Sequence, residues 1–180
     1  MDDTILIRQE TGQDFEEVRE VVRRAFLGME DSDHTEHELV DRLRRSAAFV
    51  PRLSLVAVAG GRIVGHILLT EVEIGAETGG KGGRVLALAP LSVLPGFQRK
   101  GIGGALLREA HRRAAQAGYD GVVVLGHKDY YPRFGYVKAS SFGIRFPFDA
   151  PDECCMALEL REGGLEHVSG TVRYPDAFRG

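Results

Sequence analysis

The chain has 180 residues, of which 43% are hydrophobic, and a formal net charge of -3. This length favours one domain over residues 1–180, and the mild acidity argues against a broad surface for nucleic acid or anionic membrane. No apolar run is long enough to span a bilayer, and the acidic start lacks a signal-peptide layout. The two cysteines, Cys154 and Cys155, are neighbours, so a disulfide cannot link distant segments. A cytoplasmic setting is therefore expected.

The first part of the chain predicts a strand followed by two helices. Residues 5–8 form a short apolar start. Thr11 and Asp14 are a pair suited to a helix start, and apolar residues at helical spacing follow them. Thr35 and Glu38 repeat the pattern before a second, shorter helix.

The pattern changes from helical to extended after Pro51. The predicted strands are residues 53–59, 62–74 and 84–94. Gly60-Gly61 is typical of a tight hairpin turn, and the glycine-rich residues 75–83 predict a flexible hairpin loop. Pro90 is expected to break the third strand, because proline cannot donate to a sheet ladder and marks a bulge or an edge.

The clearest predicted helix covers residues 101–117 and ends at Gly118, a natural left-handed stop. The wholly apolar residues 122–125 then predict a strand buried on both faces. A helical turn is expected over residues 129–134. Weaker strand candidates are residues 136–138, 142–146, 156–160 and 171–174.

The segment Gln98–Gly104 lies between a predicted strand and a predicted helix, an arrangement that makes an anion site. The first amides of a helix have no partners within the helix, and the helix dipole adds partial positive charge there. The glycines in this segment let a phosphate approach the backbone because no Cβ blocks it. Arg99 and Lys100 add positive side-chain charge, so a diphosphate is the expected ligand.

Taken alone, the glycine-rich segment is also consistent with a tight connection between a strand and a helix that binds no ligand. A Walker A loop is excluded because the lysine precedes the glycines. A dinucleotide fingerprint is excluded because its third glycine position is Leu106.

The run Leu91-Ser92-Val93, followed after four residues by Gln98-Arg99-Lys100-Gly101-Ile102-Gly103, resembles the acetyl-CoA signature of the GNAT superfamily of N-acetyltransferases. That signature, Gln/Arg-x-x-Gly-x-Gly/Ala after a bulged strand, is matched at Gln98, Gly101 and Gly103. The segment Tyr130–Tyr136 is similar to the family's aromatic-Tyr-x-x-x-Gly-aromatic pattern. The order of elements agrees over roughly the whole chain, and residues 170–175 resemble a poorly characterised bacterial branch of predicted acetyltransferases.

The resemblance implies an α/β (α+β) single-domain GNAT-like fold, with a mixed, mostly antiparallel, splayed sheet of about seven strands flanked by helices. It also implies acetyl-CoA as co-substrate, held partly by free backbone groups of Leu91 and Val93, with the Val93 amide polarising the thioester carbonyl. The expected donor-binding residues are Leu91, Ser92, Val93, Gln98, Arg99, Lys100, Gly101, Ile102, Gly103 and Gly104.

The same resemblance makes Tyr131 the candidate general acid, because it lies four residues before Gly135, where the family places the tyrosine that protonates the departing thiolate. A phenol is close enough to a thiol in pKa for that transfer. The alternative is an aromatic side chain that only packs on the cofactor arm. Tyr130, its neighbour, points about 100° away if the turn is helical.

The general base stays open. Glu71 is the first candidate, and Glu73 shares its face of the strand because alternate residues point the same way. His127 follows the buried strand and is a base, a substrate contact or a surface histidine. His34, Glu36 and His37 lack a fourth clear ligand, so no metal site is expected.

The sequence therefore predicts an acyltransferase that moves an acetyl group to a primary amine by direct attack in a ternary complex. The acceptor is expected to be a small-molecule or peptide amine, and the chain a monomer or homodimer with no nucleic-acid or membrane partner. The competing hypothesis is an acyl-CoA sensor that binds the donor without transferring it. The residues do not name the acceptor.

Overall fold

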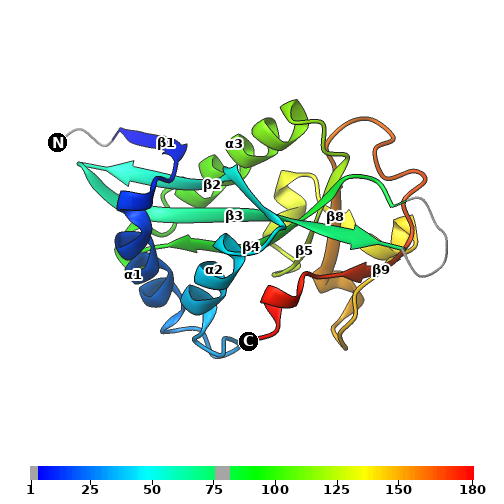
Figure 1. Cartoon of the computed structure of the whole chain (residues 1–180), viewed down its shortest axis with the longest axis horizontal. Helices are drawn as coiled ribbons and strands as arrows, with labels where there is room; N and C mark the ends of the chain where they lie inside the picture. The colour runs from blue at the N-terminus through cyan, green and yellow to red at the C-terminus, as the bar shows by residue number, and fades with distance from the viewer. Residues whose placement is uncertain (1–3, 76–81) are drawn as a thin grey trace.

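The computed structural model describes residues 4–75 and 82–180, and within these it shows a mixed sheet of nine strands and three α-helices (Figure 1). Seven strands follow one another in the order β1-β2-β3-β4-β5-β8-β6. All neighbours on this path are antiparallel except β4 and β5. The bounds are Ile5–Gln9 (β1), Phe49–Ala59 (β2), Arg62–Ile74 (β3), Val85–Val93 (β4), Gly121–Leu125 (β5), Val137–Lys138 (β6) and Cys155–Glu159 (β8).

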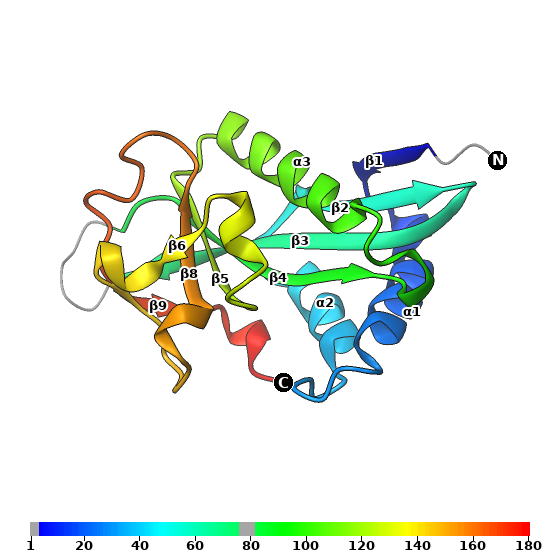
Figure 2. The ribbon, with the colours of Figure 1, turned by 180° about the vertical axis from the view of Figure 1, so that it is seen from behind.

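The helices α1 (Phe15–Phe26) and α2 (Glu36–Arg44) cover one face of the sheet, and α3 (Ile102–Gln116) covers the other, as the two opposite views show (Figures 1 and 2). The spacing of apolar residues predicts the buried face of α1, which consists of Val18, Val21, Val22 and Ala25. Gly65 in β3 lets α3 pack closely, because a Cβ there would lie 3.1 Å from the Leu106 side chain.

The hairpin of β2 and β3 turns at Gly60 and Gly61, which both have positive φ, at 56° and 77°. This confirms the predicted tight turn, since such angles suit glycine and fit the twist of the strands. Strand β2 begins at Phe49, earlier than expected, and includes Pro51. The ladder with β3 is irregular between Phe49 and Ser54, so proline's missing N–H breaks no regular pair there.

Two short strands lie off the main path: β7 (Ile144–Arg145) and β9 (Gly170–Arg173), which pair with each other in parallel. Strand β9 also pairs with the end of β3, with Glu73 opposite Arg173. Glu71 donates its N–H to the Ala48 carbonyl, and Gly75 donates to the Thr171 carbonyl. Because alternate backbone groups of a strand point to the same side, β9 lies on the same edge of β3 as β2.

The structure confirms the predicted fold class, a mixed and mostly antiparallel sheet flanked by helices. About seven strands were expected and nine are found among the described residues, because β7 has only two residues and β9 only four. Gly118 has φ of 88° and ends the α3 segment as predicted. Of the predicted loop at residues 75–83, residues 76–81 lie outside the described part of the chain.

Candidate functional site

The sheet opens between its two parallel central strands. Strands β4 and β5 pair only from Val85 to Ala87 on β4, opposite Gly121 to Val123 on β5. Beyond Ala87, β4 continues to pair with β3 but has left β5. The register with β3 shifts between Ile67 and Leu69, and Pro90, whose peptide bond with Ala89 is cis, lies in this bulged part of β4. The predicted break near Pro90 is therefore a bulge within one strand, and it accompanies the splay.

The free side of β4 presents backbone groups of the residues that the sequence predicted. The N–H of Leu94 donates to the Val64 carbonyl at 2.9 Å, so the backbone groups of Leu94 and Ser92 face β3. Because these groups alternate along a strand, those of Leu91 and Val93 face the opening. The Ser92 side chain is 1% exposed and lies opposite His66, so it contributes packing on the other side of the ladder.

The segment after β4 brings helix α3 to the opening with bare amides at its first turn. Gly101 is the N-cap of α3 and has φ of 81°, and no side chain caps the helix. Ile102 is 2% exposed, so its side chain anchors the helix start in the core and leaves only its backbone for a ligand. The first amides of α3 therefore have no side-chain cap at the place where the sequence predicts an anion site.

Gln98 has a structural task that sequence reasoning missed. Its side-chain amide donates to the Val93 carbonyl at 3.1 Å, which closes the turn between β4 and α3. Arg99 is one of the two non-glycine residues with positive φ in the described chain, at 63°. Both Arg99 and Lys100 are exposed at the helix start, so their charges are available to an anion.

The segment with the two tyrosines packs against the start of α3. A Cβ on Gly103 would lie 2.7 Å from the Tyr130 hydroxyl oxygen, 3.8 Å from the Val93 side chain and 3.9 Å from that of Leu91. A Cβ on Gly104 would lie 3.2 Å from the Phe134 ring. Because Gly103 and Gly104 have no side chains, the backbone at the start of α3 stays uncovered by their own residues. Their lack of side chains also lets the aromatic segment that begins at Tyr130 pack against the helix.

Tyr131 begins the 3-10 turn Tyr131–Phe134, which ends at Gly135 as predicted. The Tyr131 side chain is 9% exposed, and its ring packs edge-on against those of Tyr130 and Tyr136 at 5.1 and 5.5 Å. It also covers Gly126, just beyond the carboxyl end of β5. Burial raises the pKa of Tyr131, and the neighbouring Tyr130 raises it further, so the phenol stays protonated.

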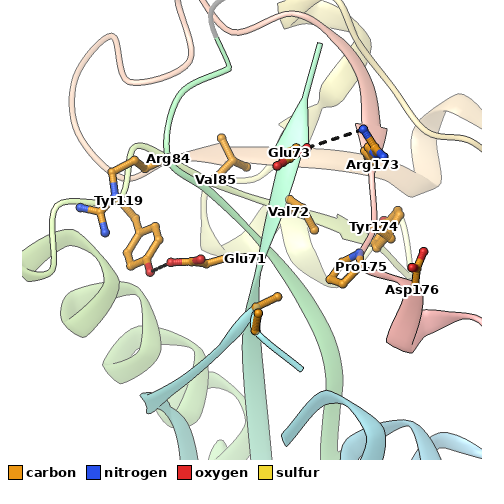
Figure 3. Close-up of a pocket in the computed structure, with 12 residues that line it drawn as sticks. Glu71, Val72, Glu73, Arg84, Val85, Tyr119, Arg173, Tyr174, Pro175 and Asp176 are labelled. Atoms are coloured by element: carbon orange, nitrogen blue, oxygen red, sulfur yellow. Dashed lines mark hydrogen bonds and ion pairs between the residues drawn. The ribbon is translucent and has the colours of Figure 1, made fainter. Parts of the chain in front are cut away.

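Glu71 lies in a different place, the edge pocket, a cavity of about 590 Å³ beside the end of β3 (Figure 3). Its carboxylate accepts a hydrogen bond from the Tyr119 hydroxyl, as the dashed line in Figure 3 shows. Tyr119 follows α3, so this bond links the far end of that helix to β3. Glu73 shares the pocket and lies 4.0 Å from Arg173. Burial and the bond to Glu71 raise the pKa of Tyr119, which keeps it a donor.

The structure thus places the hydroxyl of Tyr130 beside Gly103, Val93 and Leu91, while Tyr131 packs behind it against Tyr130, Tyr136 and Gly126. Glu71 lies apart from these residues. Glu71 pairs with Leu86, five residues before Leu91 on β4, which corresponds to about 16 Å along a strand. His127, another candidate base, is exposed, and its Nδ1 accepts the Asp129 N–H at 3.3 Å. Tyr119 was missed because nothing in its local sequence points to Glu71.

No group of three or more His, Cys, Asp or Glu side chains that could hold a metal ion is found within residues 4–75 and 82–180. In the same described ranges, none of the helices has the length and apolar character needed to cross a membrane. Cys154 and Cys155 are free thiols, and Cys155 is buried.

Comparisons with known proteins agree with this geometry. The family model described as "Acetyltransferase (GNAT) family" matches residues 15–136. A protein named "Uncharacterized N-acetyltransferase YjhQ", from Escherichia coli (strain K12), is 34% identical over 166 residues, which are 91% of this chain and 88% of that protein.

Two solved structures are similar over almost all of this chain. A GNAT family acetyltransferase from Brucella melitensis, in complex with acetyl-CoA, has a TM-score of 0.80 and 35% identity, and covers 98% of this chain and 99% of its own. YhbS from Escherichia coli, in complex with CoA, has a TM-score of 0.87 and 25% identity, and covers 98% of this chain and 92% of its own. Family model, curated relative and solved structures agree, and the chain belongs to the acetyltransferase (GNAT) family.

Proposed function

We propose that this chain transfers an acetyl group from acetyl-CoA to a primary amine by direct attack in a ternary complex. The observation that carries the proposal is the junction of β4 and α3. There the side of Leu91 and Val93 that no strand pairs with lies next to the uncapped first turn of α3. A ligand that contains amide groups and a diphosphate can use both of these protein features, and acetyl-CoA contains both groups. In the Brucella melitensis relative the bound ligand is acetyl-CoA.

In this proposal the diphosphate lies at the start of α3, where Gly101 faces open space, since nothing lies within 4 Å of a Cβ there. The backbone amides from Gly101 to Gly104 donate to it, and Arg99 and Lys100 supply charge. Arg99 is held at φ of 63°, a conformation that costs about 1 kcal/mol or more and is concentrated at ligand sites. Gln98 acts indirectly, because it fixes the turn through the Val93 carbonyl.

The amide groups of the donor bond to Leu91 and Val93, and the thioester carbonyl accepts from the Val93 N–H, which stabilises the developing oxyanion. Tyr131 protonates the departing thiolate. Its raised pKa keeps the phenol protonated at neutral pH, although it also makes the phenol a weaker acid than a free one. Glu71 is the proposed base. Its distance along the sheet from Leu91 is too long for one water molecule, so the proposal requires a chain of water molecules that relays the proton from the acceptor amine.

Calorimetric titration with acetyl-CoA tests the donor site, and release of free thiol on mixing with a panel of amines tests the transfer. We expect micromolar binding that weakens as salt rises, since charges hold the diphosphate. The variant Arg99→Gln/Lys100→Gln should bind less tightly, whereas Arg62→Gln, an exposed arginine at the hairpin of β2 and β3, should bind normally. Binding without thiol release from any amine would contradict the transferase and leave an acyl-CoA-binding protein.

The acceptor is proposed to be a small-molecule or peptide amine, and the chain to act as a monomer or homodimer. Its two free cysteines suit a reducing compartment, which supports the cytoplasm as its place of action.

A further inference from the structure

A second cavity, of about 630 Å³, adjoins the edge pocket, because Arg173 and Tyr174 line both. We call it the basic aromatic pocket and define it by six of its lining residues: Arg145, Phe148, Arg173, Tyr174, Phe178 and Arg179. They come from β7, the segment after it, the end of β9 and the final turn of the chain. Its volume is in the range of sites for small organic ligands. None of the proposed donor-site residues lines it.

The pocket carries an excess of positive charge. The Arg145 guanidinium has no hydrogen-bond or ion-pair partner within the described chain. Arg173 lies 4.0 Å from Glu73 and Arg179 lies 3.9 Å from Asp176, and both pairs are largely exposed. Pairs of this kind contribute little and are easily exchanged for a better partner. Three guanidinium groups against two carboxylates leave one net positive charge.

The rest of the wall is aromatic. The Tyr174 ring lies 5.3 Å from the Phe148 ring and 4.8 Å from the Phe178 ring. Phe148 is 48% exposed, so part of its side chain is accessible to a ligand. Burial raises the pKa of Tyr174, so its hydroxyl stays neutral and adds no negative charge to the pocket. Such a surface favours a flat apolar body.

We propose that the basic aromatic pocket binds a carboxylate attached to an aromatic group, through the guanidinium of Arg145 and the rings of Phe148 and Tyr174. A carboxylate matches the single excess charge, and its two oxygens fit the fork of an arginine. A dianionic phosphate would leave negative charge uncompensated among Glu73 and Asp176. The ligand is either the acceptor itself or a separate effector, and the shared chemistry is the aromatic carboxylate.

Calorimetric titration of the full chain with benzoate tests the site, with benzamide as the neutral probe of the same shape. We expect saturable benzoate binding that is about tenfold weaker in Arg145→Gln and that weakens as salt rises. The matched control is Arg62→Gln, because Arg62 is also an exposed arginine in a strand but lies at the far end of the sheet. It should bind benzoate as the natural chain does. Phe148→Ala should weaken benzoate and benzamide together.

Arg145 is exposed and unpaired, so Arg145→Gln is expected to fold, and an unchanged melting temperature verifies this. Equal binding of benzoate by Arg145→Gln and Arg62→Gln would overturn the proposal, as would binding of benzamide as tight as that of benzoate. Absence of benzoate binding would overturn it too. These measurements need no acetyl transfer, so their outcome is separate from that of the proposed function.

The source of the carboxylate is decided by transfer assays, and this step alone rests on the proposed function. The two amines compared are 4-(aminomethyl)benzoate and its carboxamide. If the carboxylate belongs to the acceptor, the acid is the better substrate, Arg145→Gln removes the preference through KM, and benzoate competes. If it belongs to an effector, benzoate changes the turnover of a neutral amine without competing with it.

Discussion

The guanidinium group of Arg44 and the carboxylate of Glu10 form an ion pair with two hydrogen bonds of 2.9 Å, and only 6% and 3% of the two side chains are exposed. The pair ties α2 to the residue that follows β1. Burial by itself would raise the pKa of Glu10, but the bonds from Arg44 and the charges of His66 and Arg44 hold it below its ordinary value. Glu10 is therefore charged in the folded chain and depends on Arg44.

Replacing Arg44 by methionine would leave the Glu10 carboxylate buried without its partner. We expect Arg44→Met to lower the free energy of unfolding by about 3–5 kcal/mol, measured by urea denaturation. The matched control is Arg112→Met, because Arg112 is 55% exposed and pairs with Glu109 on the helix surface. That change should cost about 1 kcal/mol or less. Equal stabilities of the two variants would show that the buried pair is not needed.

His66 makes stability depend on pH. Burial lowers its pKa from 6.5 to about 4, although the nearby Glu10 carboxylate opposes this, and the charge of Arg44 lowers it further. The unfolded chain takes up the proton first, so the stability from neutral His66 is full above pH 6.5 and is lost as the pH falls to about 4. The loss is on the order of 3 kcal/mol.

Urea denaturation above pH 6.5 and near pH 4 measures this loss for the natural chain and for His66→Gln, in which an amide replaces the imidazole bonded to Ser54. The variant should lose clearly less stability between the two conditions. His167→Gln, at an exposed position, should behave as the natural chain does. His111 is partly buried, its burial lowers its pKa, and it remains in both variants, so a residual loss is expected.

Tyr131→Phe removes the proposed acid and keeps the ring that packs between Tyr130 and Tyr136. Turnover should fall about a hundredfold, with little change in the KM for acetyl-CoA. Tyr130→Phe is the control, because its hydroxyl lies at Gly103, beside the donor-binding helix start. An unchanged turnover in Tyr131→Phe, or a larger loss in Tyr130→Phe, would remove Tyr131 from the acid role.

Gly126→Ala tests the position of Tyr131 without changing it. A Cβ on Gly126 would overlap the Tyr131 ring, lying 2.9 Å from its Cδ2 atom. We expect turnover to fall because the hydroxyl is displaced, while binding of acetyl-CoA is kept. The control is Gly28→Ala, since nothing lies within 4 Å of a Cβ there. Steady-state kinetics on both variants decides the point, and a normal turnover in Gly126→Ala would show that the position of the ring does not matter.

Glu71→Gln tests the proposed base. We expect turnover to fall about a hundredfold near neutral pH and to recover at alkaline pH, where the acceptor amine is already deprotonated. Tyr119→Phe removes only the hydrogen bond to Glu71, so its effect should be smaller. A flat loss of activity at all pH values would indicate a structural role for Glu71 instead.

The elements and the donor segment could be predicted from the sequence because their causes are local. The limits of β3 follow from the Gly60-Gly61 turn, and the anion site follows from glycines at the start of α3. The separation of β4 from β5 was expected only through the family resemblance. It depends on where pairing with β5 stops, at Ala87, and no local pattern marks that point.

Other features depend on residues far apart in the chain. Glu10 and Arg44 are 34 residues apart, and Tyr119 and Glu71 are 48 apart, so neither pair leaves a local signal. Glu71 lies in the edge pocket, apart from the predicted donor residues, because β3 continues beyond its pairing with β2. The basic aromatic pocket escaped prediction for the same reason, since its arginines meet only when β9 joins β3 and β7.

The placement of β9 also bears on how copies of this chain meet one another. An unpaired strand edge invites another chain to add to it, and natural proteins block such edges. Past Thr70, β3 has left β2, and β9 takes over its edge at Glu73 and Ile74. This four-residue strand therefore covers a strand edge to which another copy of the chain could otherwise add. The same strand carries Arg173, which lines the basic aromatic pocket.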